Sequence, residues 1–171
     1  MKTPDSTALR RIAALALTCL TLTMNAEPNS EKVLFDFTTA TNLPAWQIVN
    51  DDVMGGVSRS QFAVLTRSAV FSGVVSLENN GGFASCRTPP GRHDLTGLDA
   101  FVVRVRGDGR RYQFTVRTEA EFDAPLYQAT IQTKIGEWEE HRLLFKDFLP
   151  KFRGRVLTGA PPLNPTTVSS V

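Results

Sequence analysis

The chain has 171 residues, with 19 Lys and Arg against 17 Asp and Glu. This length favours a single domain. The near-neutral charge argues against the broad basic surface by which nucleic-acid-binding proteins are recognised.

The N-terminus has the composition of a cleaved leader. Lys2, Arg10 and Arg11 precede an apolar run over residues 12–24, and Ala26 follows. This order predicts a secretory signal peptide over residues 1–26, and the apolar run is too short for a comfortable membrane span. We therefore expect an exported chain with no stable span after cleavage. A mitochondrial presequence and an uncleaved N-terminal membrane anchor are the alternatives.

The first half of the remaining chain predicts short strands after a lead-in over residues 27–32. Alternating apolar residues indicate strands at 33–38 and 46–49, and then two strands within 60–78 that turn near residues 66–68. The NNGG sequence at 79–82 predicts a tight turn, because Asn and Gly tolerate positive φ. Another strand follows within 82–88.

The second half continues the pattern and sets the fold class. Residues 98–106 and 110–118 read as a hairpin turned by Gly-Asp-Gly, and two more strands follow within 126–134 and 136–145. Residues 146–155 read as a loop whose Phe148 and Phe152 tuck under the sheet. Many short strands with Gly and Pro turns predict an all-β sandwich or barrel. The last residues, 160–171, are Pro-rich and predict no closing strand. Either the sheet closes early or the final strands are missing, and we favour the second interpretation.

The sequence VNDDVMGGVSRSQF at residues 49–62 is the first candidate site. Its polar and glycine residues are Asn50, Asp51, Asp52, Gly55, Gly56, Ser58 and Arg59. Adjacent acids on a strand point to opposite sides, so Asp51 and Asp52 are badly placed as a catalytic pair. We expect a polar structural corner in which Arg59 pairs with one of these acids. A loop that contacts a ligand or partner is the alternative, and a calcium or catalytic site is a third.

A second candidate loop carries Glu78, Asn79 and Asn80, which form either a hairpin turn or a ligand-binding loop. Arg106-Gly107-Asp108 matches a cell-adhesion tripeptide, but a tight turn demands the same residues, and we assign it to the turn.

Other signs of chemistry are few. His93 and His141 have no zinc spacing, and we expect no metal and no cofactor. After removal of the leader, Cys86 is a single cysteine, which is typical of a small buried residue. Trp46, Tyr127 and Trp138 are candidates for a sugar-binding platform, although strand positions favour core or rim.

Five blocks together resemble the complex I intermediate-associated protein 30 family. They are WQIVNDDVMGGVSRSQF, FSGVVSLENNGGFASCRT, VRVRGDGRRYQFTVRT, GEWEEHRLLFKDFLPKFRGR and APPL, and the resemblance covers about residues 33–163. The resemblance implies a galactose-binding-domain-like jelly-roll sandwich over residues 33–171 that lacks its final strands, because family members continue past APPL.

The resemblance also implies a function. Mitochondrial members of the family help to assemble respiratory complex I, so we expect a non-enzymatic domain of the assembly-factor type that acts through protein–protein contacts. A carbohydrate-binding module with a glycan ligand is the alternative. A hydrolase that uses Asp51 or Glu78 is a third hypothesis.

Overall fold

The computed structural model describes residues 31–39, 41–119, 121 and 124–171. The predicted leader and most of the lead-in lie outside these residues. Ten strands and four short 3-10 helices form the described part of the chain. The strands are β1 Gln47–Asn50, β2 Arg59–Leu65, β3 Ser68–Val74, β4 Ala84–Arg87, β5 Ala100–Arg106, β6 Arg111–Arg117, β7 Leu126–Gln132, β8 Trp138–Leu144, β9 Leu149–Phe152 and β10 Arg155–Val156. The 3-10 helices are η1 Asp51–Met54, η2 Glu78–Asn80, η3 Phe145–Asp147 and η4 Pro165–Thr167.

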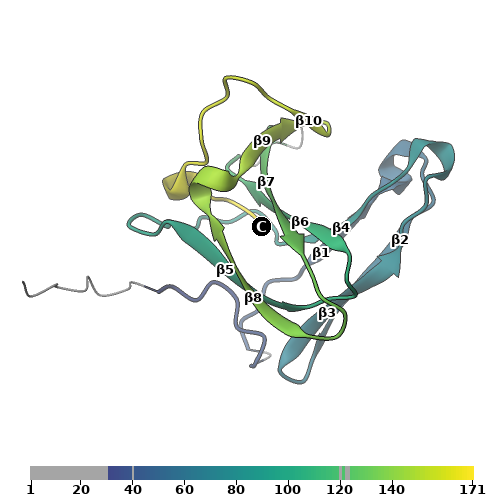
Figure 1. Cartoon of the computed structure of the whole chain (residues 1–171), viewed down its shortest axis with the longest axis horizontal. Helices are drawn as coiled ribbons and strands as arrows, with labels where there is room; N and C mark the ends of the chain where they lie inside the picture. Colours follow the sequence, from purple (N-terminus) through teal and green to yellow (C-terminus); the bar gives the residue numbers. More distant parts are fainter. Residues whose placement is uncertain (1–30, 40, 120, 122–123) are drawn as a thin grey trace, which may run out of the picture.

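The strands form two regions (Figure 1). In the body, the antiparallel pair β5–β8 lies opposite a sheet of order β10-β9-β7-β6. In the arm, at the right of the figure, β1 pairs with β4 and β2 pairs with β3. The expected all-β sandwich is confirmed, and its jelly-roll winding stays a prediction.

The core of the body follows the alternation of the sequence. Phe101, Tyr127, Ile131 and Leu143 are buried at alternate strand positions, and Phe148 is buried after β8. Each such side chain contributes about 1.5–3 kcal/mol when it leaves water. The prediction for Phe148 is confirmed. Residues 149–152 and 155–156 were expected to be loop, but they form β9 and β10, which extend the sheet beyond β7.

The predicted hairpin over residues 98–118 is wrong. β5 pairs with β8 and β6 pairs with β7, so the turn at 107–109 carries the chain from one sheet to the other. The connection from β7 to β8 crosses beside it: the Gly136 amide donates to the Gly107 carbonyl at 2.9 Å, and the Gly109 amide donates to Thr133 Oγ1 at 3.1 Å. The two connections bond to each other, and this arrangement keeps their strands in separate sheets.

The predicted strand at residues 33–38 is also wrong. The Asp36 carboxylate accepts hydrogen bonds from the amide and hydroxyl of Thr38, at 2.8 and 2.6 Å, and so turns the backbone locally. Phe35 and Phe37 instead pack against Trp46, which stacks on Phe62 of β2 with ring centroids 4.8 Å apart. The segment is held by an aromatic cluster.

The end of the chain pairs with two distant segments, although we predicted no strand there. His93 bridges Val168, and Arg117 bridges Ser170, both antiparallel. Val168 and Ser170 are 0% and 2% exposed. Residues 168–171 therefore lie between the chain after β4 and the end of β6.

Candidate functional site

The first candidate loop forms a corner at the outer end of the arm. Residues 51–58 leave β1 through η1 and return to β2, and they lie against residues 75–83, which connect β3 to β4 (upper right of Figure 1). The side chain of Asp51 joins the two connections. It is 0% exposed.

Four hydrogen bonds hold the Asp51 carboxylate. The Ser58 amide donates to Oδ1 at 2.9 Å, and the Ser58 hydroxyl donates to Oδ2 at 2.5 Å. From the other connection, the amides of Gly82 and Phe83 donate to Oδ2 at 2.7 and 3.3 Å. Both carboxylate oxygens are thus occupied by donors of the chain itself.

This environment lowers the pKa of Asp51. Burial is the largest single influence and raises the pKa, but the hydrogen bonds from Ser58, Gly82 and Phe83 together outweigh it. The net result lowers the pKa from 3.8 to about 2. Asp51 is therefore an ionised hydrogen-bond acceptor near neutral pH, and it is unsuited to accept or donate a proton there.

Glycines make room for this carboxylate. A Cβ at Gly56 would overlap the carboxyl group of Asp51, and a Cβ at Gly81 would lie 2.5 Å from Asp51 Oδ2. Gly55 has φ +88°, a left-handed conformation that favours glycine. Gly55 and Gly56 are candidate residues from the sequence alone, whereas Gly81 is not, because its role depends on a contact with residue 51.

The side chains of Asn50 and Asp52 accept hydrogen bonds from nearby residues of the chain. Asn50 Oδ1 accepts a hydrogen bond from the Ser60 hydroxyl at 2.6 Å, and Asp52 Oδ1 accepts one from the Val53 amide at 3.1 Å. Asp51 is buried whereas Asp52 is exposed, so the two do not face each other as an acid–base pair.

The expected ion pair of Arg59 is absent from the described residues. Arg59 is exposed at the start of β2, and the donors that hold Asp51 are a hydroxyl and backbone amides. The prediction failed because Gly82 and Phe83, more than thirty residues away, supply the donors that we assigned to Arg59.

The second candidate loop lies at the same corner. Glu78, Asn79 and Asn80 form η2 and have exposed side chains, and Asn79 and Asn80 have φ of 53° and 60°. The expected positive φ is confirmed. The hairpin alternative is wrong, because β3 pairs with β2 whereas β4 pairs with β1.

Three aromatic residues do not form a shared sugar platform. Tyr127 is buried in the body, and Trp46 stacks on Phe62 within the aromatic cluster. Trp138 is exposed on β8 beneath Arg104, whose guanidinium carbon lies 5.1 Å from the ring centroid. Cys86 is half-buried, and burial raises the pKa of its thiol to about 11, which keeps the thiol protonated. No helix among the described residues is long and apolar enough to cross a membrane.

Comparison with known proteins gives a consistent family. The sequence pattern of the complex I intermediate-associated protein 30 family matches residues 35–171. The protein named "Complex I intermediate-associated protein 30, mitochondrial" from Drosophila melanogaster is 30% identical, over 82% of this chain and 55% of its own length. The protein of the same name from Mus musculus is 27% identical, over 82% of this chain and 49% of its own length.

The chain thus spans about half the length of the curated relatives it matches. Both relatives are mitochondrial by name, which agrees with the alternative location and gives no support to export. Neither name gives support to a glycan ligand. The family pattern covers nearly all of the described residues, including the Asp51 corner, and the chain therefore belongs to the complex I intermediate-associated protein 30 family.

Proposed function

We propose that this chain is a non-catalytic domain of the assembly-factor type, which binds a protein partner through the surface of the Asp51 corner. Its relatives are named for association with an intermediate of complex I. By analogy, the partner would be a subunit of such an intermediate that presents an apolar surface. The ten loop residues selected from the sequence would lie in or beneath the contact.

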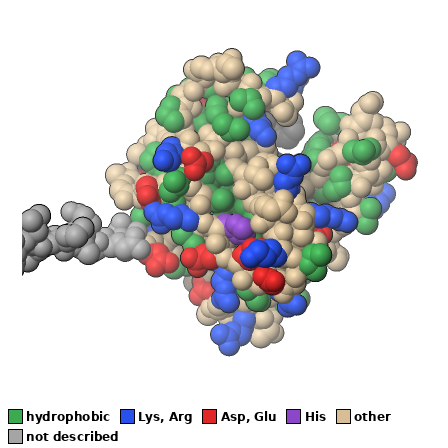
Figure 2. Space-filling model, in the orientation of Figure 1, with side chains coloured by type: hydrophobic (Ala, Val, Ile, Leu, Met, Phe, Trp, Pro, Cys, Tyr) green, Lys and Arg blue, Asp and Glu red, His purple; other side chains and the backbone are tan. Residues whose placement is uncertain are grey.

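The observation that carries this proposal is a group of exposed hydrophobic side chains around the corner. Leu77, Met54 and Val53 are 81%, 65% and 62% exposed. We call the group the corner surface, and its members are Val53, Met54, Val57, Val75, Leu77 and Phe83. Figure 2 shows hydrophobic side chains gathered on the lobe at the upper right, which is the outer end of the arm. Exposed apolar groups gathered in this way mark interaction sites more often than chance placement.

The polar residues of the corner fit the same function. The carboxylate of Asp51 and the hydroxyl of Ser58 are used inside the protein, so they shape the corner. Asp52, Arg59 and Glu78 are exposed beside the apolar group. Protein interfaces commonly combine an apolar centre with a polar rim. A catalytic role would require a free base or nucleophile, and Asp51 is occupied on both oxygens.

Site-specific photo-crosslinking tests the proposal. A photoreactive amino acid would replace Leu77 in cells of the source organism, and Ile135, which is 80% exposed in the β7–β8 connection, provides a matched control. We expect crosslinks from position 77 to subunits of a complex I intermediate and none of these from position 135. Equal products from both positions, or none from position 77, would contradict the proposed surface.

We further propose that residues 33–171 form the functional domain and that residues 1–26 are removed. The basic start and apolar run support removal, which would accompany either export or mitochondrial import. N-terminal sequencing of the mature protein should begin near residue 27, whereas a chain that retains Met1 would refute removal. Cell fractionation would then distinguish the two locations.

A further inference from the structure

A second recognition site is suggested by residues 31–39, which we call the strap. Figure 1 draws the strap in purple, as irregular chain at the lower left of the body. Within the part of the chain that the structure describes, no hydrogen bond joins the backbone of the strap to the backbone of another segment. The Lys32 ammonium donates to the Asp94 carbonyl at 2.8 Å, and the bonds from Thr38 to Asp36 stay within the strap. Side chains therefore hold the strap, and such a segment opens at a lower free-energy cost than a strand of a sheet.

Two aromatic side chains of the strap lie in an aromatic groove, which is formed by Trp46, Phe62 and His93. The ring centroid of Phe35 lies 5.5 Å from that of Trp46 and 5.9 Å from that of His93. The ring centroid of Phe37 lies 5.9 Å from that of Trp46 and 6.2 Å from that of Phe62. These separations are typical of favourable edge-on and tilted aromatic pairs. The aromatic groove thus accommodates two aromatic side chains that are two residues apart.

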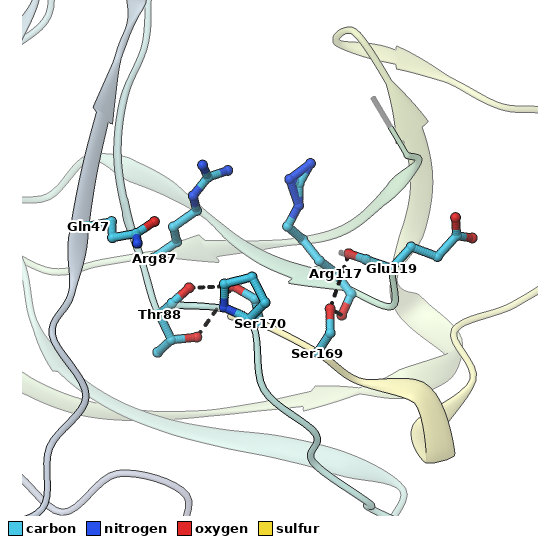
Figure 3. A pocket seen from close by; sticks show the side chains of 8 residues that line it. Gln47, Arg87, Thr88, Arg117, Glu119, Ser169 and Ser170 are labelled. Atoms are coloured by element: carbon cyan, nitrogen blue, oxygen red, sulfur yellow. Dashed lines mark hydrogen bonds between the residues drawn. The ribbon is translucent and has the colours of Figure 1, made fainter. Parts of the chain in front are cut away.

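The aromatic groove is separate from the polar side of β1. Gln47 follows Trp46, and Figure 3 shows its side chain lining a polar pocket beside Arg87 and Thr88. Successive side chains of extended backbone point to opposite sides, so the ring of Trp46 lies on the other side, where it stacks on Phe62. No member of the corner surface lines the groove, and the two surfaces are therefore independent.

The strap leaves one polar group of the aromatic groove unsatisfied. The indole N–H of Trp46 is buried and has no hydrogen-bond acceptor within the described chain. A buried donor without an acceptor costs free energy that a paired donor does not cost. His93 adds no charge to the groove near neutral pH, because burial and the positive charge of Lys32 both lower the pKa of its imidazole. A segment with two aromatic side chains and a carbonyl near the indole would therefore satisfy the groove more fully than the strap does.

We propose that the aromatic groove binds a segment of a partner protein that has two aromatic side chains two residues apart, and that the strap competes with this segment. The strap supplies the template, since Phe35 and Phe37 have this spacing. Residues 40–45 join the strap to Trp46, and this short connection gives the strap a high effective concentration at the groove. The apparent affinity for a partner then falls in proportion to the fraction of chains with an open groove. The groove is independent of the protein contact proposed for the corner surface.

Fluorescence anisotropy with a labelled peptide of the strap tests the groove. The probe is EKVLFDFTT, residues 31–39, and the control peptide EKVLADATT lacks both phenyl rings. The double variant Phe35→Ser/Phe37→Ser releases the strap in the full chain. We expect this variant to bind the probe saturably, and about tenfold or more tightly than the wild type does, because the competing strap is removed. The control peptide should show no saturable binding.

A milder variant decides the question if circular dichroism shows that the double variant is unfolded. Lys32→Ala removes the bond to the Asp94 carbonyl and leaves both phenyl rings in place. It should tighten probe binding about two- to fivefold, as expected for an exposed charged hydrogen bond. Lys146→Ala removes an exposed lysine of η3 and should leave probe binding at the wild-type level.

The proposal would be overturned by three results in these titrations. They are no saturable binding of the probe to either strap variant, equal binding of the control peptide, and equal affinity of the wild type and the folded double variant. Size-exclusion chromatography with light scattering completes the test, and we expect a monomer. A concentration-dependent dimer of the wild type that is lost in Phe35→Ser/Phe37→Ser would assign the groove to the strap of a second copy, and would overturn the assignment to a partner protein.

Discussion

The glycine at position 56 gives the sharpest test of the corner, because an added methyl group has no room beside the Asp51 carboxylate. In Gly56→Ala, the new Cβ would lie 2.8 Å from the Cβ of Asp51 and still closer to its carboxyl group. Carbon atoms in contact are normally about 3.5–4.0 Å apart. Asp51 cannot move aside without loss of its bonds to Ser58, Gly82 and Phe83.

The expected cost follows from similar overpacking elsewhere in proteins. Forcing a methyl group into a packed site destabilises a protein by about 1–3 kcal/mol. For a chain of this size, each kcal/mol lowers the melting temperature by about 2–4 °C. We therefore expect Gly56→Ala to melt about 2–12 °C below the wild type.

A second glycine provides the control. At Gly91 the nearest atom to an added Cβ is His93 Nε2, at 3.8 Å, and the backbone is not left-handed. Gly91→Ala should be neutral or stabilise the protein by about 0.4–1 kcal/mol, because it restricts the unfolded chain. Urea unfolding followed by circular dichroism at pH 7 measures both variants. Equal stability of Gly56→Ala and Gly91→Ala would refute the packing argument.

A double-mutant cycle identifies the atom responsible. Asp51→Ala removes the carboxylate that the new methyl group would meet, so Gly56→Ala should cost less in that background than in the wild type. An additive result would mean that the methyl group acts elsewhere.

Three further predictions concern the same corner. Ser58→Ala removes a hydroxyl that donates to Asp51 and accepts from the Ser76 amide at 2.9 Å. Urea unfolding should therefore show a loss of about 1–3 kcal/mol in the free energy of unfolding, and an unchanged urea midpoint would contradict a stabilising role for these bonds. Because folding lowers the pKa of Asp51 from 3.8 to about 2, its contribution is complete above about pH 4 and is lost as the pH falls to about 2. Melting temperatures over this range should decline less steeply in Asp51→Asn, and parallel curves would contradict the assignment. Arg59 is exposed, so Arg59→Ala should change the free energy of unfolding by no more than about 0.5 kcal/mol. A larger loss in urea unfolding would support the ion pair that the sequence predicted.

Local patterns were sufficient to predict strands but not all of their partners. The two strands within residues 59–74 are separated only by the turn at residues 66–67. Their pairing as β2 and β3 is therefore predicted from this short stretch. Residues 98–118 have the same local pattern, yet Gly107 bonds to Gly136 and the chain changes sheet. The pairing of these strands therefore depends on contacts between residues that are far apart in the sequence, which a short stretch of sequence does not reveal.

The candidate sites show the same limit. The sequence placed Asp51, Gly56 and Ser58 in one corner, since they lie within eight residues of each other. It did not reveal that Gly82 holds the Asp51 carboxylate. The partner of a buried acid depends on the path of the backbone, and backbone amides leave no signature in the sequence.

Recovery of partner proteins by two surface variants tests the central claim most directly. Leu77→Asp places a charge within the corner surface, and Ile135→Asp places the same charge at an equally exposed position elsewhere. In affinity purification from cells of the source organism, we predict that Leu77→Asp loses the complex I subunits recovered with the wild type, while Ile135→Asp retains them and both variants keep the wild-type melting temperature. Undiminished recovery of those subunits with Leu77→Asp would contradict the account.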